Sequence, residues 1–67
     1  MNNTVVGRED GMWWSTEKGW VTHLFWATKF NHNSATLIAY GLNKTEKLHV
    51  FTEMMQIAAA RVASEGK

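Results

Sequence analysis

The chain has 67 residues, a formal net charge of +1 and no cysteine. A chain of this length has room for one domain and buries only about 60% of the surface that its unfolded form exposes. The absence of cysteine excludes disulfides and the common cysteine-ligated zinc sites, so oligomerisation is the aid to stability that we expect. Charges of both signs are interspersed, which argues against a polybasic arm for nucleic acid or anionic lipid.

The beginning of the chain shows neither a secretory signal nor a membrane segment. Residues 1–10 lack a basic stretch followed by an apolar one, and no apolar run approaches the ~20 residues that cross a bilayer. We therefore expect a cytoplasmic protein. Residues 1–10 are interpreted as a flexible arm or a short edge strand, and residues 11–67 as a single α+β domain.

Turn signals divide the next part of the chain into extended segments. Residues 12–16 are rich in strand-favouring side chains, and Glu17, Lys18 and Gly19 then form a typical tight turn with glycine placed for positive φ. Residues 20–30 alternate between two faces, which predicts a second strand. A helix over residues 15–30 is the alternative, although Gly19 would fall in its first turns.

A third strand is predicted over residues 35–42, after a polar turn cluster, and a fourth is possible over residues 4–7. A helix is predicted from about residue 44 to 64, because Asn43 and Glu46 have the spacing of a capping box. Its apolar stripe at spacings of three and four comprises Leu48, Phe51, Met55, Ala58, Ala59 and Val62. The predicted fold is thus a three- or four-stranded antiparallel meander packed against one C-terminal amphipathic helix.

The residue types that catalysis needs are present, but no pattern brings them together. His23, His32 and His49 fall on different predicted elements, and the only aspartate, Asp10, lies in the N-terminal arm. No pair of histidines has the spacing of metal ligands, and no glycine-rich loop opens a helix to hold a phosphate. We expect no enzyme activity, no metal and no cofactor.

Aromatic side chains are the most informative feature. Four Trp, three Phe and one Tyr are more than one small core needs. Because adjacent strand residues point to opposite faces, Trp13 and Trp14 should lie on different sides of the sheet, as should Phe25 and Trp26. Such a surplus is typical of protein interfaces. The predicted partner or dimer surface consists of Trp13, Trp14, Trp20, Phe25, Trp26, Val50, Met54, Ile57 and Arg61.

Two functions remain open at this stage. The first is a non-catalytic interaction module, a homodimeric inhibitor or adaptor of an unidentified partner protein; phages and plasmids encode such small domains against host enzymes. The second is DNA binding. Over residues 11–64 the order of elements is similar to AP2-type and integrase N-terminal domains, in which a sheet enters the major groove, and the sheet would offer Lys18 and Lys29. If residues 15–30 were helical, residues 38–45 would loosely resemble a helix-turn-helix.

Overall fold

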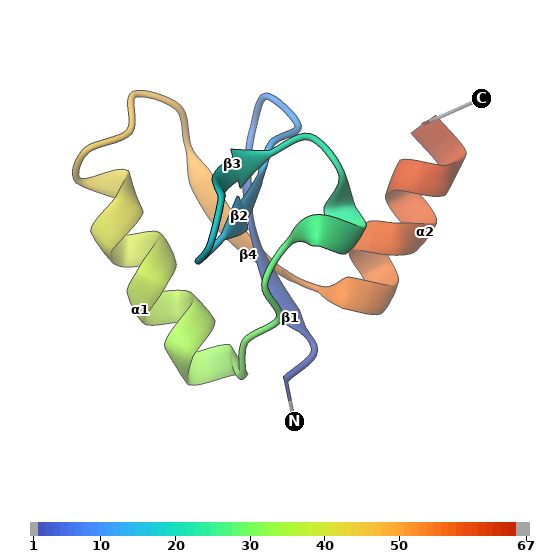
Figure 1. Ribbon diagram of the computed structural model, residues 1–67, viewed down its shortest axis with the longest axis horizontal. Helices are drawn as coiled ribbons and strands as arrows, with labels where there is room; N and C mark the ends of the chain where they lie inside the picture. The colour runs from blue at the N-terminus through green and yellow to red at the C-terminus, as the bar shows by residue number, and fades with distance from the viewer. Residues whose placement is uncertain (1, 66–67) are drawn as a thin grey trace.

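The structure is a computed structural model that describes residues 2–65 (Figure 1). Four strands form one antiparallel sheet in the order β3-β2-β1-β4. Helix α1 lies on one face of the sheet, and the 3-10 helix η1 and helix α2 lie on the other. The elements are β1 (Thr4–Arg8), β2 (Trp13–Ser15), β3 (Gly19–Val21), η1 (Leu24–Trp26), α1 (His32–Asn43), β4 (Val50–Met54) and α2 (Met55–Glu65). The predicted α+β class, with a C-terminal helix packed on an antiparallel sheet, is confirmed.

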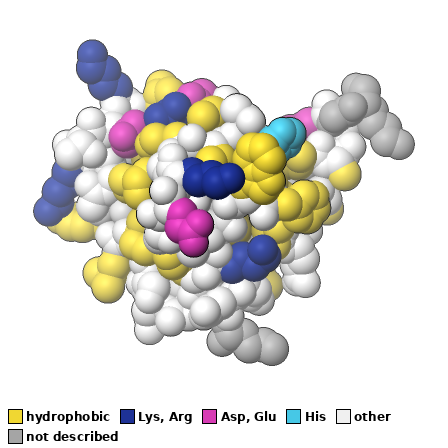
Figure 2. Space-filling view, viewed as in Figure 1, with side chains coloured by type: hydrophobic (Ala, Val, Ile, Leu, Met, Phe, Trp, Pro, Cys, Tyr) yellow, Lys and Arg dark blue, Asp and Glu magenta, His cyan; other side chains and the backbone are white. Residues whose placement is uncertain are grey.

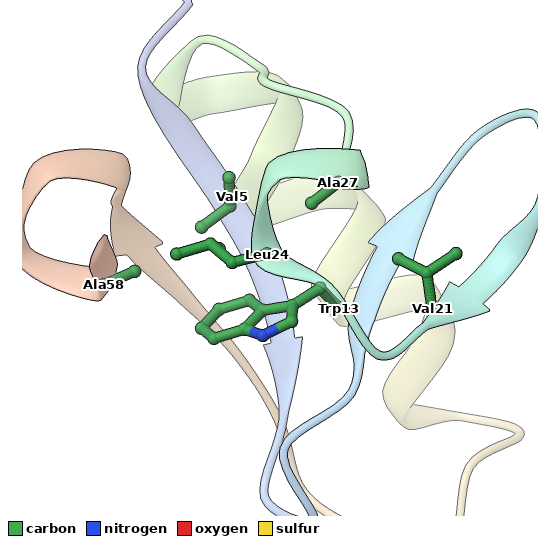
Figure 3. Packing of buried hydrophobic residues seen from close by; sticks show 6 residues of the cluster. All are labelled: Val5, Trp13, Val21, Leu24, Ala27 and Ala58. Atoms are coloured by element: carbon green, nitrogen blue, oxygen red, sulfur yellow. The ribbon is translucent and has the colours of Figure 1, made fainter. Parts of the chain in front are cut away.

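The sheet separates two hydrophobic cores. On the side of α2, which Figure 3 shows, the buried residues are Val5, Trp13, Val21, Leu24, Ala27 and Ala58. On the side of α1 they are Val6, Ala35, Ala39 and Val50, with Trp14, Trp20, Phe30, Ile38 and Leu42 partly buried against them. Successive side chains of a strand point to opposite faces, so each strand contributes to both cores in turn. The sheet therefore has no bare face.

Strand β1 is an inner strand, so the possible fourth strand over residues 4–7 is confirmed, and residues 4–8 form neither a flexible arm nor an edge strand. It pairs with β2 on one side and with β4 on the other. Val5 and Val6 are both 0% exposed because one faces each core. A strand covered on both faces needs apolar side chains at adjacent positions, and Val5 and Val6 supply them.

The predicted strand over residues 20–30 is wrong beyond Val21. The tight turn before it is confirmed, since Ser15 pairs with Gly19 and Gly19 has a φ of +79°. After Val21 the chain leaves the sheet and forms η1. Leu24 and Ala27 are both buried on the α2 side, and a spacing of three residues on one side belongs to a 3-10 turn rather than to a strand.

The predicted strand over residues 35–42 is also wrong, because this segment is the helix α1. Asn31 is its N-cap, with its side-chain Oδ1 accepting a hydrogen bond from the N–H of Ser34 at 2.8 Å. Ala35 and Ala39 are buried one turn apart, as a helix facing the sheet demands. The polar cluster over residues 31–34 therefore starts a helix instead of closing a hairpin.

The predicted helix over residues 44–64 is correct only from Met55 onward, because β4 occupies residues 50–54. β4 pairs with the whole of β1, from Arg8 opposite Val50 to Thr4 opposite Met54. Leu48 and Phe51 of the predicted apolar stripe therefore lie outside the helix, as do Val50 and Met54 of the predicted surface.

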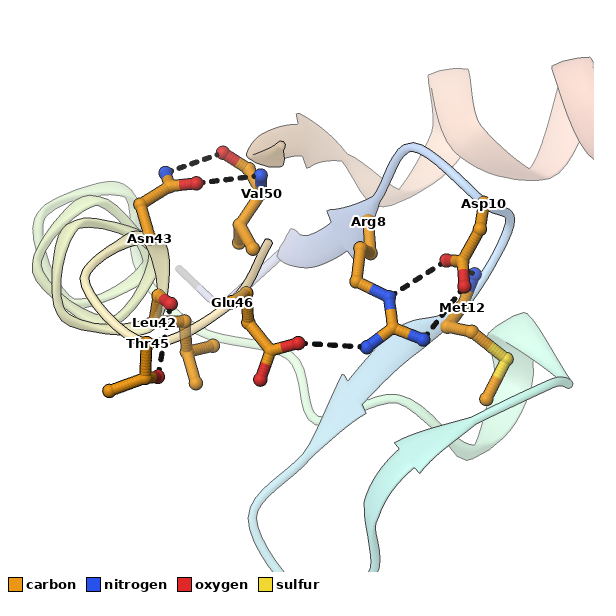
Figure 4. Close-up of polar contacts among 8 residues, drawn as sticks. All are labelled: Arg8, Asp10, Met12, Leu42, Asn43, Thr45, Glu46 and Val50. Atoms are coloured by element: carbon orange, nitrogen blue, oxygen red, sulfur yellow. Dashed lines mark hydrogen bonds and ion pairs between the residues drawn. The ribbon is translucent and has the colours of Figure 1, made fainter. Parts of the chain in front are cut away.

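The predicted capping box is wrong as well, since both of its residues have other partners (Figure 4). The side-chain amide of Asn43 donates to the carbonyl oxygen of Val50 and accepts from its N–H, both at 2.9 Å. Glu46 accepts a hydrogen bond from Arg8 at 2.9 Å. Asn43 thus satisfies the backbone N–H and carbonyl groups of Val50 on the outer edge of β4, where no other strand of residues 2–65 pairs.

Gly7 lies against two aromatic rings of the α2-side core. A Cβ atom placed on Gly7 would lie 2.8 Å from Cζ of Phe51 and 2.8 Å from Cζ3 of Trp13. These two rings meet edge to face over the glycine, with centroids 6.1 Å apart. Only a residue without a side chain allows both rings to reach the sheet.

Replacing Gly7 with alanine is expected to lower the free energy of unfolding by about 1–3 kcal/mol, because rigid rings must move to admit the methyl group. Urea denaturation followed by circular dichroism measures the change. The control is G41A in α1, where a Cβ would meet nothing within 4 Å and a gain of up to about 1 kcal/mol is expected from helix propensity. Equal stability of G7A and the parent protein would contradict this packing.

Candidate partner-binding site

The residues predicted for a partner surface divide into buried and exposed groups. Trp13 and Val50 are only 3% and 2% exposed and belong to the two cores, so neither is presented to a partner. Trp14 and Trp20 are half-buried on the α1 side and contact each other edge to face, with ring centroids 5.3 Å apart. These four side chains hold the sheet together.

Phe25 and Trp26 are the aromatic residues of the predicted set that reach solvent. Their exposed fractions are 75% and 56%, and both lie on η1. We call these two side chains the aromatic pair. The prediction that Phe25 and Trp26 face opposite sides of a strand is wrong, because the chain is not extended here. Met54 and Ile57 are exposed as well, at 40% and 52%, where β4 passes into α2.

The loop that carries the aromatic pair is fixed to the fold on both sides of it. Leu24 and Ala27, which flank the pair, are 4% and 5% exposed. The N–H of Thr28 donates to the carbonyl oxygen of Trp14 at 3.0 Å, and the Oγ1 of Thr28 accepts from the N–H of Thr16 at 2.9 Å. The two outward side chains are therefore held between buried neighbours, which preorganises them for contact.

Trp26 has two polar neighbours. The Nζ atom of Lys18 lies 4.9 Å from the centroid of the Trp26 ring, within the range of a cation–π contact. The ring of His23 lies 4.5 Å from that of Trp26, at an interplanar angle of 74°. In Figure 2, hydrophobic side chains gather over η1 beside a histidine and Lys or Arg side chains. Among residues 2–65, Lys18 belongs to none of the ion pairs.

Arg61, the last residue of the predicted surface, is turned toward the sheet. It donates a hydrogen bond to Glu53, pairs with Glu65 at 3.5 Å, and lies over the rings of Trp13 and Phe51. The hydrogen bond with Glu53 is the main reason why the pKa of Arg61 is raised, although desolvation opposes it. Arg61 lines a hollow of about 300 Å³ between the β1–β2 turn and α2, whose rim also carries Glu9, Asp10 and Glu65.

A second polar cluster centres on Arg8 and joins distant segments of the chain (Figure 4). Its guanidinium donates to Asp10 at 2.9 and 2.7 Å, donates to Glu46 at 2.9 Å and lies 4.6 Å from the ring centroid of Trp20. The pKa of Asp10 is lowered, first by its hydrogen bonds with Arg8 and against a smaller effect of desolvation. This cluster ties the β1–β2 turn and the α1–β4 loop to the sheet.

The two geometries considered for DNA binding are not formed. Both faces of the sheet are covered, so no strand face is open to a major groove. Residues 15–30 contain β3 and η1 instead of a long helix, and β4 separates α1 from α2, so no helix-turn-helix is present in residues 2–65.

Within residues 2–65, no three His, Asp or Glu side chains are grouped so that they could hold a metal ion. No helix of these residues is long and apolar enough to cross a membrane. No protein family, no curated protein and no solved structure matches this chain.

Sequence reasoning missed one exposed apolar surface. Leu37 and Tyr40 are 71% and 65% exposed on the outer side of α1, and the Nζ of Lys44 lies 4.7 Å from the centroid of the Tyr40 ring. Their spacing of three residues signals one helical face, but only if this segment is recognised as a helix. The contact of Lys18 with Trp26 was equally hidden, because it depends on the fold of η1.

The lowered pKa of Asp10 predicts how stability depends on pH. The folded state binds this proton more weakly than the unfolded state, so the contribution is complete above the ordinary carboxyl value of 3.8 and is lost as pH falls toward the folded pKa. The variant D10N should therefore be less stable than the parent protein at pH 7, and the difference should shrink below pH 4. Urea unfolding over this range measures it.

The control is E17Q, because Glu17 takes part in no ion pair among residues 2–65. It should leave stability at pH 7 close to that of the parent protein. A stability difference for D10N that stays constant from pH 7 to pH 3 would show that the contact with Arg8 does not stabilise the fold.

Proposed function

We propose that this protein is a non-catalytic protein-interaction module, an inhibitor or adaptor that acts in the cytoplasm, with the aromatic pair as its central contact. The observation that carries the proposal is the exposure of Phe25 and Trp26 on a loop whose neighbouring residues are buried. Leu24 and Ala27 are buried in the core, whereas the two rings between them are mostly exposed.

Energetics support this proposal. Burying a large apolar side chain is worth about 1.5–3 kcal/mol, and this free energy is not gained for side chains left in water. A partner that covers Phe25 and Trp26 would gain it on binding. Tryptophan is enriched among the few residues that dominate binding energy at interfaces. Since the loop is held at both sides, little further ordering is needed.

Self-association is the second part of the proposal. Met54 and Ile57 stand exposed at the start of α2, and Leu37 and Tyr40 stand exposed on α1. Val50, which belongs to the predicted partner or dimer surface with Met54 and Ile57, is buried, so a dimer surface where β4 passes into α2 would rest on fewer side chains. A small chain without disulfides would gain stability from a second copy at either place.

The double variant F25S/W26S is expected to abolish capture of the partner and leave the fold intact, because both side chains are exposed. The tagged protein would be incubated with an extract of its source cells, with and without nuclease treatment, and captured proteins would be identified by mass spectrometry. The matched control is L37S/Y40S, which removes two equally exposed apolar side chains from α1. The urea midpoint of F25S/W26S should agree closely with that of the parent protein.

Loss of a stoichiometric partner in F25S/W26S, with retention in L37S/Y40S, supports the proposal. If the partner is retained by F25S/W26S, the aromatic pair is not the binding site. If captured material disappears after nuclease treatment, the protein binds nucleic acid instead of a partner protein.

A further inference from the structure

We propose that the partner segment which covers the aromatic pair is acidic, with an apolar side chain against Trp26 and a carboxylate directed at Lys18. This inference rests on the proposed function and specifies the chemistry of the partner. It comes from the position of Lys18 over the exposed ring, 4.9 Å from its centroid, without an ion pair among residues 2–65.

The turn that carries Lys18 is held in place. The buried Oγ of Ser15 accepts hydrogen bonds from the N–H groups of Glu17 and Lys18, at 3.3 and 3.2 Å. Gly19 then takes a φ of +79° to close the hairpin. The fixed backbone places the start of the Lys18 side chain near Trp26, and its ammonium group lies 4.9 Å from the ring centroid. An exposed cation held next to an exposed apolar ring is suited to a ligand that combines a negative charge with an apolar group.

Charge is distributed unevenly between this site and the hollow near Arg61. In the sequence, residues 15–30, which include η1, carry Lys18, Lys29 and Glu17, two positive charges and one negative. At the rim of the hollow the acidic residues Glu9, Asp10 and Glu65 outnumber Arg8 and Arg61. The segment that carries the exposed rings therefore has a small excess of positive charge, with Lys18 beside Trp26, and this favours an acidic partner at η1.

Single-stranded nucleic acid is the other ligand with apolar surfaces and negative charge, since bases stack on aromatic rings beside lysines. Two features favour a protein segment. The ammonium group of Lys18 lies over the Trp26 ring, which leaves less free ring surface, and the broad face of a base needs more of it than a single aliphatic side chain does. Only Lys18 and Lys29 are near in sequence to provide contacts for a run of phosphates.

The test uses defined probes and the indole N–H signal of Trp26 in NMR spectra of the whole chain. The probes are an eight-residue peptide of alternating glutamate and leucine, the same peptide with lysine for glutamate, the same peptide with serine for leucine, and an oligomer of eight thymidines. The glutamate–leucine peptide should shift the Trp26 signal and bind at least about 5-fold tighter than the other two peptides at low salt, with affinity falling as salt rises.

The variant K18Q should weaken binding of this peptide by about 3-fold or more, and K18R should retain it, because an exposed charge contact contributes up to about 1 kcal/mol. The matched control is K44Q, which removes a lysine that lies over the Tyr40 ring on α1 in a similar way. K44Q should leave the affinity for the peptide unchanged.

The outcomes separate this inference from the function it rests on. If the acidic and basic peptides shift Trp26 equally and K18Q has no effect, the acidic partner is excluded, while loss of the captured protein in F25S/W26S still supports an interaction module. If no peptide shifts Trp26, or if only the thymidine oligomer does, the inference is overturned. Retention of the captured protein by F25S/W26S refutes the proposed function itself.

Discussion

The burial of one small sheet on both faces is the constraint on which the rest of this structure depends. Val5 and Val6 are adjacent and both fully buried, so β1 must be covered from two sides. Trp13 and Trp14 repeat this arrangement on β2. Helix α1 supplies one cover, and η1 with α2 supplies the other. Most aromatic side chains are therefore packed in or against the two cores. A sheet covered on one face only would have left several of them exposed.

Since most aromatic side chains pack in the two cores, the exposed rings of Phe25 and Trp26 stand out. Scattered exposed apolar residues are ordinary on any protein surface. Phe25 and Trp26 differ because they are adjacent, lie between two buried residues and have a lysine and a histidine beside them. The clusters around Arg8 and Arg61, in contrast, engage their guanidinium groups with carboxylates and aromatic rings of the fold. The interaction proposal therefore centres on η1.

Local patterns predicted the class of the fold but not the assignment of every segment. The hairpin turn at Gly19 and the opposite orientation of Trp13 and Trp14 follow from short-range rules, and both are found. Residues 35–42 fit a strand and a helix equally well, because apolar side chains occupy nearly every position. The Asn31 cap, which decides for a helix, was interpreted as a turn. β4 was hidden because its pairing with β1 is a tertiary contact.

For the candidate site, too, local sequence patterns do not reveal contacts that depend on the tertiary fold. Phe25 and Trp26 were identified by composition and spacing, whereas their neighbours Lys18 and His23 are set by a 3-10 turn that no periodicity revealed.

Fluorine NMR of the protein labelled with 5-fluorotryptophan is the most direct test of the central claim that the fold buries Trp13 and presents Trp26. The four tryptophan signals would be assigned by single Trp→Phe variants and their solvent isotope shifts compared in H₂O and D₂O. The account predicts the largest shift for Trp26 and almost none for Trp13; a large shift for Trp13 with a small one for Trp26 would contradict it.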